Sequence, residues 1–267
     1  MPSQSPASDA RTASDPNFME SFARGLQVLR AFSSSAPHLS IAEASRITGL
    51  SRAATRRCLY TLQRLGYATV RNGAYALTPQ VLTLGYSYLA SAPLAVVAQP
   101  ILERVSEQLR ETSSLAVLDH DDILYVARSA RKRLLSPGVA IGGRLPAYCT
   151  SMGRVLLAAR PAAELTAYLD RLTIVAHTSH TVQSRSALRS ELRRVRHQGF
   201  AFIDQELELG VRSFAVPVKT PDDRTVAAIN AGVQNPTLPV RALVKDYLPV
   251  LSRAADELGQ ALALKTL

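Results

Sequence analysis

Four arginines and no acidic residue lie within residues 51–65, which read SRAATRRCLYTLQRL. The apolar side chains of this segment recur at helical spacing and are Cys58, Leu59, Leu62 and Leu65. Such spacing predicts an amphipathic helix with one apolar face and one purely cationic face. Guanidinium groups on the cationic face suit the phosphates and guanine edges of duplex DNA. The chemistry indicated by this segment is therefore nucleic-acid binding rather than catalysis.

The order of residues along this helix suggests a division of roles. The first turn of a recognition helix reaches base edges, so Arg52 and Arg56 are the candidates for guanine contacts. Arg57, Arg64 and Arg71 are better placed for phosphates, which position a protein without reading sequence. The candidate DNA-binding residues are Ser40, Ser51, Arg52, Ala53, Arg56, Arg57, Tyr60, Arg64 and Arg71. Taken alone, the arginines are equally compatible with a basic, solvated helix on an ordinary helical bundle.

The elements that precede this helix favour a DNA-reading module. A first helix is expected over residues 18–33, and its apolar face is expected to consist of Phe22, Leu26, Leu29 and Phe32. Ser40, followed three residues later by Glu43, forms a capping-box pattern that begins a second helix. Gly49 then supplies the tight turn before Ser51, which caps the arginine-rich helix.

A hairpin pattern follows the arginine-rich helix. That helix is expected to end at Gly66, and two short alternating strands then flank Asn72-Gly73. Asn-Gly between alternating residues is the strongest local signal of a two-residue hairpin. Three helices followed by a hairpin predict a winged helix-turn-helix over residues 18–79. In this context the DNA-binding interpretation is favoured over the solvated bundle.

Charge and length agree with two domains and a polyanionic partner. The chain has 267 residues, of which 47% are hydrophobic, and a formal net charge of +10. Such a charge favours nucleic acid or an acidic membrane surface. Residues 18–79 hold eight arginines against two acids, so more than half of the net charge lies in under a quarter of the chain. No run of about 18 apolar residues occurs, so no transmembrane segment is expected.

The N-terminus and the cysteines bear on localisation. Residues 1–17 are rich in Ser, Pro and Ala and lack the apolar region of a secretory signal, so a disordered leader is expected. The two cysteines, Cys58 and Cys149, are expected to be free thiols in a reducing compartment rather than a disulfide. We therefore expect a cytoplasmic protein that does not contact the membrane.

The second half of the chain has a mixed pattern. A helix from residue 79 to about 90 and another ending near 111 predict a helical connector and a helix that leads into the next domain, together over residues 80–111. Residues 112–267 then alternate between strand and helix patterns, with strands expected at 114–119, 123–129, 200–204, 211–218 and 225–233. Helices are expected at 150–159, 162–169, 186–198 and 239–263, the last kinked at Pro249. Strands joined by hairpins, with helices at the flanks, predict an α+β domain with an antiparallel sheet.

Several motifs resemble a known family. Three segments are similar to IclR-type bacterial transcriptional regulators: RGLQVL (24–29), SRAATRRCLYTL (51–62) and GYATVRNGAYALTP (66–79). Three more resemble the branch that includes PcaR, PcaU and PobR: GGRLPAYCTSMGRVLLA (142–158), DQELELGVRSFAVPV (204–218) and VAAINAGV (226–233). The resemblance covers residues 18–262. It implies a winged-helix domain, a linker helix and a GAF-like effector domain, assembled as a homodimer or homotetramer.

The same resemblance implies where an effector binds. Carried over position by position, it gives a pocket formed by Leu145, Tyr148, Ser151, Met152, Gly153, Asp204, Ser213, Asn230 and Gly232. Residues 150–154 form a loop-to-helix junction, and the N–H groups at such a helix start attract carboxylates. A capped helix start without a ligand is the alternative. Arg144 and Arg212 flank these motifs and suit either that carboxylate or salt bridges with Asp204, Glu206 or Glu208.

Other polar clusters do not indicate catalysis or a metal. The DHDD segment at 119–122 lies between two strand patterns and is expected to be a hairpin loop. His177 and His180 occur without a CxxC or HExxH context, so zinc is not indicated. The alternating carboxylates of 204–208 are explained by salt bridges at a strand end. Because GxSxG, P-loop and GxGxxG motifs are absent, we expect no enzyme and no cofactor.

The function implied by the resemblance is regulation of aromatic acid catabolism through the β-ketoadipate pathway. The expected regulator binds an inverted repeat of double-stranded DNA with half-sites one or more helical turns, about 34 Å each, apart. A small aromatic or dicarboxylic acid, such as protocatechuate, 4-hydroxybenzoate or β-ketoadipate, is the expected effector. Activation, with RNA polymerase as a partner, is favoured over repression because the branch contains mostly activators. An enzyme with a fused DNA-binding module and a constitutive DNA binder are the alternatives.

Overall fold

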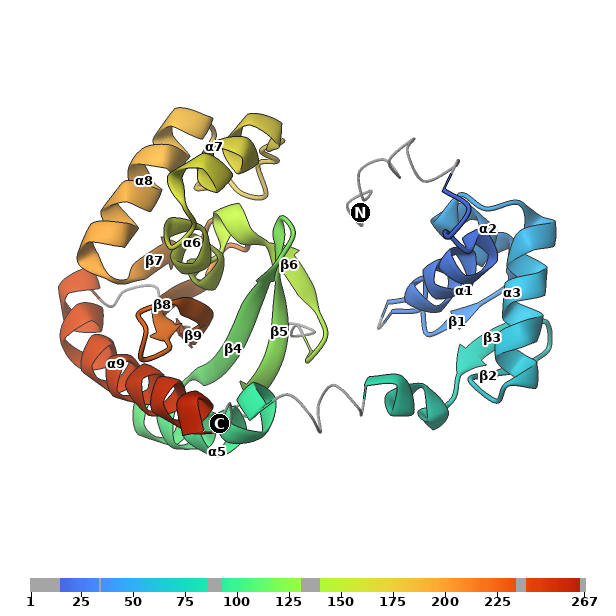
Figure 1. Ribbon diagram of the computed structural model, residues 1–267, viewed down its shortest axis with the longest axis horizontal. Helices are drawn as coiled ribbons and strands as arrows, with labels where there is room; N and C mark the ends of the chain where they lie inside the picture. Colours follow the sequence, from blue (N-terminus) through green and yellow to red (C-terminus); the bar gives the residue numbers. More distant parts are fainter. Residues whose placement is uncertain (1–14, 34, 86–92, 131–139, 234–238, 265–267) are drawn as a thin grey trace. The chain divides into compact units, whose positions relative to one another are not determined.

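The chain folds into two compact units, Met1–Tyr88 and Leu89–Leu267. The computed structural model describes residues 15–33, 35–85, 93–130, 140–233 and 239–264 (Figure 1). Most of the leader expected over residues 1–17, and the second half of the helix expected after residue 79, lie outside these residues. Within the described ranges, no helix has the length and apolarity needed to cross a bilayer.

The first unit is a winged helix-turn-helix, as the sequence predicts. Its helices are α1 (Glu20–Arg30), α2 (Ile41–Thr48) and α3 (Arg52–Arg64), and a short 3-10 helix, η2, spans Pro79–Val81. Its antiparallel sheet has the order β1-β3-β2, with β1 at His38–Leu39, β2 at Ala68–Arg71 and β3 at Ala74–Leu77. Asn72 and Gly73 both adopt positive φ, 51° and 78°, as a two-residue hairpin of this kind requires. Sequence analysis did not predict β1, whose two residues are too few to show alternation.

The core of this unit differs in two respects from the apolar helix faces expected from the sequence. The buried residues of its apolar cluster are Val28, Ala31, Leu39, Ala44 and Leu59. Phe22 and Leu26, expected on the apolar face of α1, are 64% and 39% exposed, because only the last turns of α1 contribute to this core. Leu65, expected in the apolar stripe of α3, is 56% exposed because it follows the last helical residue and no longer keeps the helical phase.

The second unit is built on one six-stranded antiparallel sheet, with the strand order β6-β5-β4-β9-β8-β7. The strands are β4 (Thr112–Asp119), β5 (Asp122–Ser129), β6 (Arg144–Pro146), β7 (Ala201–Asp204), β8 (Arg212–Lys219) and β9 (Thr225–Val233). Five of them coincide with expected strands to within two residues. The edge strand β6 was not predicted, since it has three residues and ends in a proline. The α+β class with an antiparallel sheet is confirmed.

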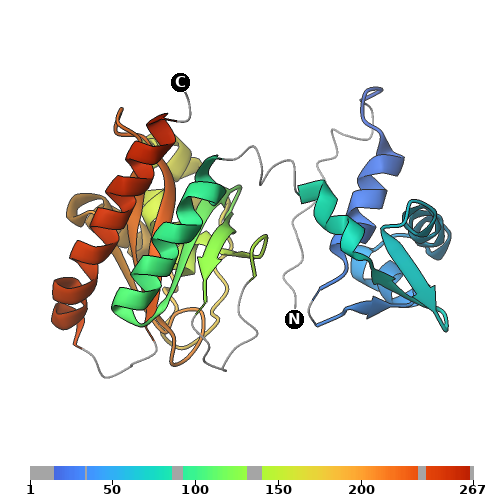
Figure 2. The same cartoon turned by 90° about the horizontal axis from the view of Figure 1, so that it is seen from below.

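Helices cover both faces of this sheet. On one face, α5 (Pro93–Leu109) and α9 (Val240–Leu264) lie side by side (Figure 2). On the other face lies α6 (Ser151–Ala158), and α8 (Arg185–Gln198) packs against α6 from outside, with α7 (Ala162–Arg171) beside it (Figure 1). The helix α9 continues as one element through Pro249. The helix α5, grouped with the connector in the sequence, packs on β4, β5 and α9 of the second unit.

The pleat of the sheet divides the core into two apolar clusters. Phe214, Ile229 and Leu243 belong to the cluster beneath α5 and α9. Ala215, Ala228 and Met152 belong to the cluster around α6. Since successive residues of a strand point to opposite faces, Ser213 and Asn230 lie on the α6 face of β8 and β9.

Candidate functional site

Hydrogen bonds at the helix ends fix the position of α3. Ser40 Oγ accepts from the N–H of Glu43 at 3.2 Å, while Glu43 Oε2 accepts from the N–H of Ser40 at 2.8 Å, so the expected capping box is formed. Gly49 follows α2 with a φ of 71°. Ser51 Oγ then accepts from the N–H of Ala54 at 3.2 Å and caps α3. Two of the candidate DNA-binding hydroxyls therefore already have a structural role.

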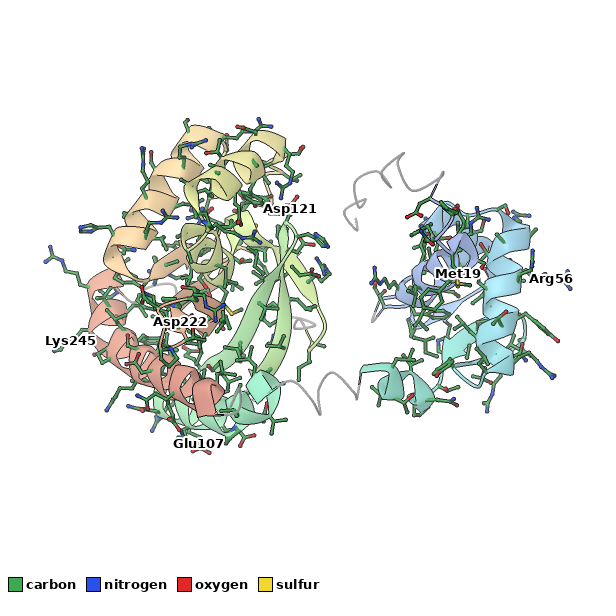
Figure 3. The ribbon with its side chains drawn as sticks, viewed as in Figure 1. Met19, Arg56, Glu107, Asp121, Asp222 and Lys245 are labelled. Atoms are coloured by element: carbon green, nitrogen blue, oxygen red, sulfur yellow. The ribbon has the colours of Figure 1, made fainter. Side chains whose placement is uncertain are left out.

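The outer face of α3 is cationic, as expected. Eight of the nine candidate DNA-binding residues are exposed, and Ser40 is half-buried. The inner face contains Thr55 and Leu59, both fully buried, and Thr55 was not predicted there. Figure 3 shows Arg56 on the side of α3 that faces away from α1.

No acidic group neutralises these arginines within the described residues. None of Arg52, Arg56, Arg57, Arg64 and Arg71 has a carboxylate within 4.0 Å, and the ion pair of this unit joins Arg24 to Glu20 on α1. Guanidinium groups without carboxylate partners remain available to phosphates. This surface, defined by Arg52, Arg56, Arg57, Arg64 and Arg71, is called the α3–wing surface below.

In the second unit, the start of α6 is buried and tightly packed. Thr150 Oγ1 accepts from the N–H of Gly153 at 3.2 Å and caps the helix. All eight residues of α6 are buried. A Cβ on Gly153 would lie 2.1 Å from the carbonyl oxygen of Ala147, so only glycine permits this close approach of backbone segments.

Three polar side chains meet beside this helix start. Ser151 Oγ lies 2.5 Å from Ser213 Oγ, which also accepts from Asn230 Nδ2 at 3.0 Å. Asn230 is only 8% exposed, and its Oδ1 has no hydrogen-bond partner among the described residues. A buried acceptor without a donor costs about 1–3 kcal/mol. The Ser151–Ser213–Asn230 chain therefore has an unused hydrogen-bonding atom in apolar surroundings, the composition typical of a small-molecule site.

The aromatic and thiol groups near this chain are neutral at pH 7. Burial raises the pKa of Tyr148 to about 12, and burial together with the nearby Glu206 raises the pKa of Cys149 to about 12. The phenol of Tyr148 donates to the carbonyl of Val175 at 2.7 Å and accepts from its N–H at 3.2 Å. Its ring stacks on His177 with the ring centroids 6.2 Å apart. Tyr148 thus holds the segment after α7 against the start of α6.

A buried ion pair fixes the same region. Arg154 Nη2 lies 2.6 Å from Glu206 Oε2, and the two side chains are 3% and 11% exposed. Arg154 Nε also donates to the carbonyl of Tyr148 at 3.0 Å. Glu206 Oε2 accepts from the N–H of Val182 at 3.1 Å. One carboxylate and one guanidinium therefore join α6, the segment after α7 and the β7–β8 connection.

The structure separates three other candidate effector residues from the polar chain. Arg144 is ion-paired with Asp119 and, at 3.2 Å, with Asp122, at the edge strand β6. Arg212 Nε lies 3.3 Å from Asp204 Oδ1. Because Ile203, not Asp204, pairs with Ser213, the side chains of Asp204 and Arg212 point to the opposite face of the sheet. For Arg212 the geometry supports the expected salt bridge with Asp204, whereas Arg144 forms salt bridges with Asp119 and Asp122 and not with the acids expected over 204–208.

Each remaining candidate has a clear place. Met152, Gly153 and Gly232 lie next to the polar chain, since Gly232 pairs with Ser213 across β8 and β9. Leu145 packs half-buried on the apolar cluster around α6. The DHDD segment is the turn of the β4–β5 hairpin, as expected, with Asp119 opposite Asp122. Both cysteines are free, and the described part of the chain contains no group of three residues suited to a metal.

Comparison with protein families identifies the chain. The model described as "Bacterial transcriptional regulator IclR C-terminal" matches residues 86–260, and the one described as "IclR helix-turn-helix domain" matches residues 21–71. The chain belongs to the IclR family. Its members are transcriptional regulators, so the alternative of an enzyme with a fused DNA-binding module is set aside.

Individual relatives support the expected branch of the IclR family. The "Pca regulon regulatory protein" of Pseudomonas putida is 49% identical over 91% of this chain and 84% of the relative. The "p-hydroxybenzoate hydroxylase transcriptional activator" of Acinetobacter baylyi is 33% identical over 91% of each chain. A solved structure of a double mutant of the PobR inducer-binding domain from Acinetobacter, in complex with 3-hydroxybenzoic acid, is 32% identical. It has a TM-score of 0.58 and covers 62% of this chain and 97% of that one.

Sequence reasoning missed two residues of this IclR-family site. Arg154 directly precedes the apolar run Val-Leu-Leu-Ala. A cation at the start of such a buried run needs an acidic partner, so the sequence did contain a signal for a buried ion pair at Arg154. Ser114 pairs with Asn230 across β4 and β9 and is 2% exposed. No local pattern distinguishes Ser114 from an ordinary strand serine, because its neighbour comes from a strand more than a hundred residues later.

Proposed function

We propose that this IclR-family chain activates genes of aromatic acid catabolism in response to a small acid bound at the Ser151–Ser213–Asn230 chain. The observation that carries the proposal is the unpartnered Oδ1 of Asn230, buried beside the start of α6; this acceptor suits a hydroxyl group of the ligand, such as the phenol of a hydroxybenzoic acid, and not its carboxylate. The positive end of a helix dipole favours a carboxylate nearby. The two named relatives, a Pca regulon regulator and an activator for p-hydroxybenzoate hydroxylase, support this class of target and effector.

The proposed mechanism couples two equilibria. The regulator binds duplex DNA through the α3–wing surface, as a homodimer on an inverted repeat in the cytoplasm. The acid must bind one arrangement of the two units better than another, because a ligand with equal affinity for both shifts nothing. RNA polymerase is the partner that an activator recruits. Repression of the same kind of operon is the second candidate, since it uses the same surfaces.

Thermal stability with and without candidate acids tests the effector assignment. The panel is protocatechuate, 4-hydroxybenzoate, β-ketoadipate and cis,cis-muconate. An acid present at 100 times its dissociation constant should stabilise the protein by about 2.7 kcal/mol. Replacing Ser213 with valine should abolish this stabilisation, because it removes the central hydroxyl of the chain. The matched control is Ser113→Val, which removes a hydroxyl on the opposite face that donates to the carbonyl of Asn230 at 2.8 Å.

The control separates the effector role from simple loss of a buried hydrogen bond. Both substitutions delete one hydrogen-bonded hydroxyl, fully buried at Ser113 and half-buried at Ser213, so both are expected to lower the melting temperature without ligand. Only Ser213→Val should also lose the stabilisation by the acid. An equal response of both variants to every acid would remove Ser213 from the effector site.

Two arginine substitutions test the division of roles on the α3–wing surface. Arg56→Ala should cost about 1–3 kcal/mol on the preferred DNA sequence and relax the preference at one base pair. Arg71→Ala should weaken binding to all sequences alike, because a phosphate contact carries no sequence information. Competition binding with operator and random duplex measures both effects. Identical losses on the two duplexes for both variants would contradict the assignment of Arg56 to a base.

A further inference from the structure

The formal net charge of the chain is concentrated in two segments, residues 18–79 and the helix α8. Residues 18–79 have a net charge of +6, and α8 has five arginines against Glu191, which gives +4. These two values together equal the whole formal net charge of +10. The charges of the remaining residues therefore sum to zero, although residues 131–133, which read RKR, form a local cluster of three cations. Within the second unit, which has 22 basic and 17 acidic residues, the 14-residue helix α8 supplies +4 of the net charge of +5.

Four arginines of α8 form a row beside its buried face, on the side of α7 and the end of α6. Leu188, Leu192 and Val195 are buried and pack in the apolar cluster around α6. Along the rest of the helix, arginines recur at intervals of four, four and three residues, at Arg185, Arg189, Arg193 and Arg196. Side chains at such intervals are neighbours on a helix surface, about 5–6 Å apart. Figure 1 shows α8 as the outermost layer of the second unit, beyond α6. These four residues are called the α8 row.

The α8 row retains its charge because its partners are neutral. Arg185 donates to the carbonyl of Leu172 at 2.8 and 3.1 Å, and Arg196 donates to the carbonyls of Ala158 and Arg160 at 2.5 Å. These carbonyls end α7 and α6, where a cation is favoured by the helix dipole. Capping explains the position of these two guanidiniums, and the partial negative charge of a helix end offsets only part of their full positive charge.

The other two members bond only to hydroxyls in the described structure. Arg189 Nη1 donates to Thr166 Oγ1 at 3.3 Å, and Arg193 Nη2 donates to Ser190 Oγ at 3.2 Å. None of the four has a carboxylate within 4.0 Å there, whereas the adjacent Arg194 is paired with Glu191 at 2.6 Å. The α8 row is therefore a line of four guanidiniums without an acidic partner.

The chemistry of this surface selects its partner. The apolar side of α8 is buried in the core, so the helix has no apolar face to insert into a membrane. It contains no Phe, Tyr or Trp, and His197 in its last turn is its one aromatic side chain, so it lacks a platform of aromatic residues for successive single-stranded bases. Guanidiniums spaced along a rigid helix match the regularly spaced phosphates of a duplex. We propose that the α8 row is a second phosphate-binding surface for duplex DNA, which acts in addition to the α3–wing surface.

The salt dependence of DNA binding tests this proposal, which rests on the proposed DNA-binding function. The probe is a random-sequence duplex of about 60 bp, long enough to engage both surfaces. Each lost phosphate contact should reduce the slope of log affinity against log salt by about 0.9. The double variant Arg189→Gln/Arg193→Gln should therefore reduce that slope by about 1.8. Both residues bond only to hydroxyls, so the fold should be retained.

The matched control removes the same charge at the same spacing elsewhere. Arg241→Gln/Lys245→Gln deletes two exposed cations four residues apart on α9; Figure 3 shows Lys245 extending from the outer side of that helix. Its salt slope should equal that of the unmodified protein. An equal slope change in the α8 and α9 variants would attribute the effect to net charge and overturn the proposal. No change in either variant would overturn it too, and is the outcome expected if the row binds an acidic protein.

A third variant distinguishes failure of this inference from failure of the proposed function. Arg57→Gln/Arg64→Gln on the α3–wing surface should also reduce the slope by about 1.8. If this variant responds and the α8 variant does not, only the second surface is rejected. If the unmodified protein does not bind the duplex, both proposals fail. Should the α8 double variant not fold, Arg193→Gln alone should reduce the slope by about 0.9.

Discussion

Replacing Glu206 with leucine is expected to lower the free energy of unfolding of the second unit by about 3–5 kcal/mol. The substitution removes the hydrogen-bonded carboxylate of the Arg154 guanidinium, which is 3% exposed, and leaves only Glu191, at 3.7 Å, as an acidic neighbour among the described residues. It also removes the acceptor of the N–H of Val182. A buried charge that loses its hydrogen-bonded counterion is among the most costly defects in a protein interior. Chemical denaturation followed by circular dichroism measures the loss.

Two further variants identify the buried charge as the cause. Glu164→Leu breaks the ion pair with Arg160, whose side chains are 52% and 40% exposed, and should cost less than about 1 kcal/mol. The double variant Arg154→Met/Glu206→Leu should regain most of the stability, because apolar residues of similar volume often replace a buried ion pair at little cost. A double variant as unstable as Glu206→Leu alone would show that packing, not charge, is responsible.

Gly153→Ala is expected to destabilise the second unit by about 3 kcal/mol, at the upper end of the usual range for overpacking. The new Cβ would lie 2.1 Å from the carbonyl oxygen of Ala147 and 2.4 Å from its Cα. Neither atom belongs to a flexible side chain, so α6 and the segment before it must move apart. The start of α6 holds Ser151, and we therefore expect affinity for the effector acid to fall together with stability.

A second glycine provides the control for Gly153→Ala. A Cβ on Gly232 would meet no atom closer than 3.9 Å, the distance to the carbonyl oxygen of Thr112. Gly232→Ala should therefore change the unfolding free energy by less than about 1 kcal/mol, because nothing must move. Unfolding curves of the two variants, measured under one condition, give the comparison. Equal stability of Gly153→Ala and the unmodified protein would refute the expected clash.

Most local structure could be predicted because its causes are local. The capping box joins Ser40 to Glu43, three residues away, and the hairpin turn needs only Asn72-Gly73. Periodicity located the helices of both units and five strands of the large sheet. The exposed residues Phe22 and Leu26 show the limit of this reasoning, since apolar spacing says which side chains share a face but not whether anything covers it.

The candidate effector site could be predicted only in part. The resemblance to the IclR family drew attention to Ser151, Ser213 and Asn230, and these three side chains are joined by hydrogen bonds. The same reasoning included Asp204, which points to the other face of the sheet. A one-residue difference in strand pairing reverses the face of a side chain. A sequence motif does not say which residues of two strands are paired. The motif over residues 204–218 therefore could not show that Asp204 lies on the face opposite Ser213.

The sequence by itself determined the family, the winged helix-turn-helix, the α+β class and the cationic outer side of α3, because each depends on neighbouring residues or on long motifs. Only the tertiary structure decided which charges are neutralised. Arg154 finds Glu206 across 52 residues, whereas the four arginines of the α8 row find carbonyls and hydroxyls instead of acids. The reason is physical: whether an arginine keeps its charge for a partner depends on which groups lie within a few ångströms, and folding sets those distances.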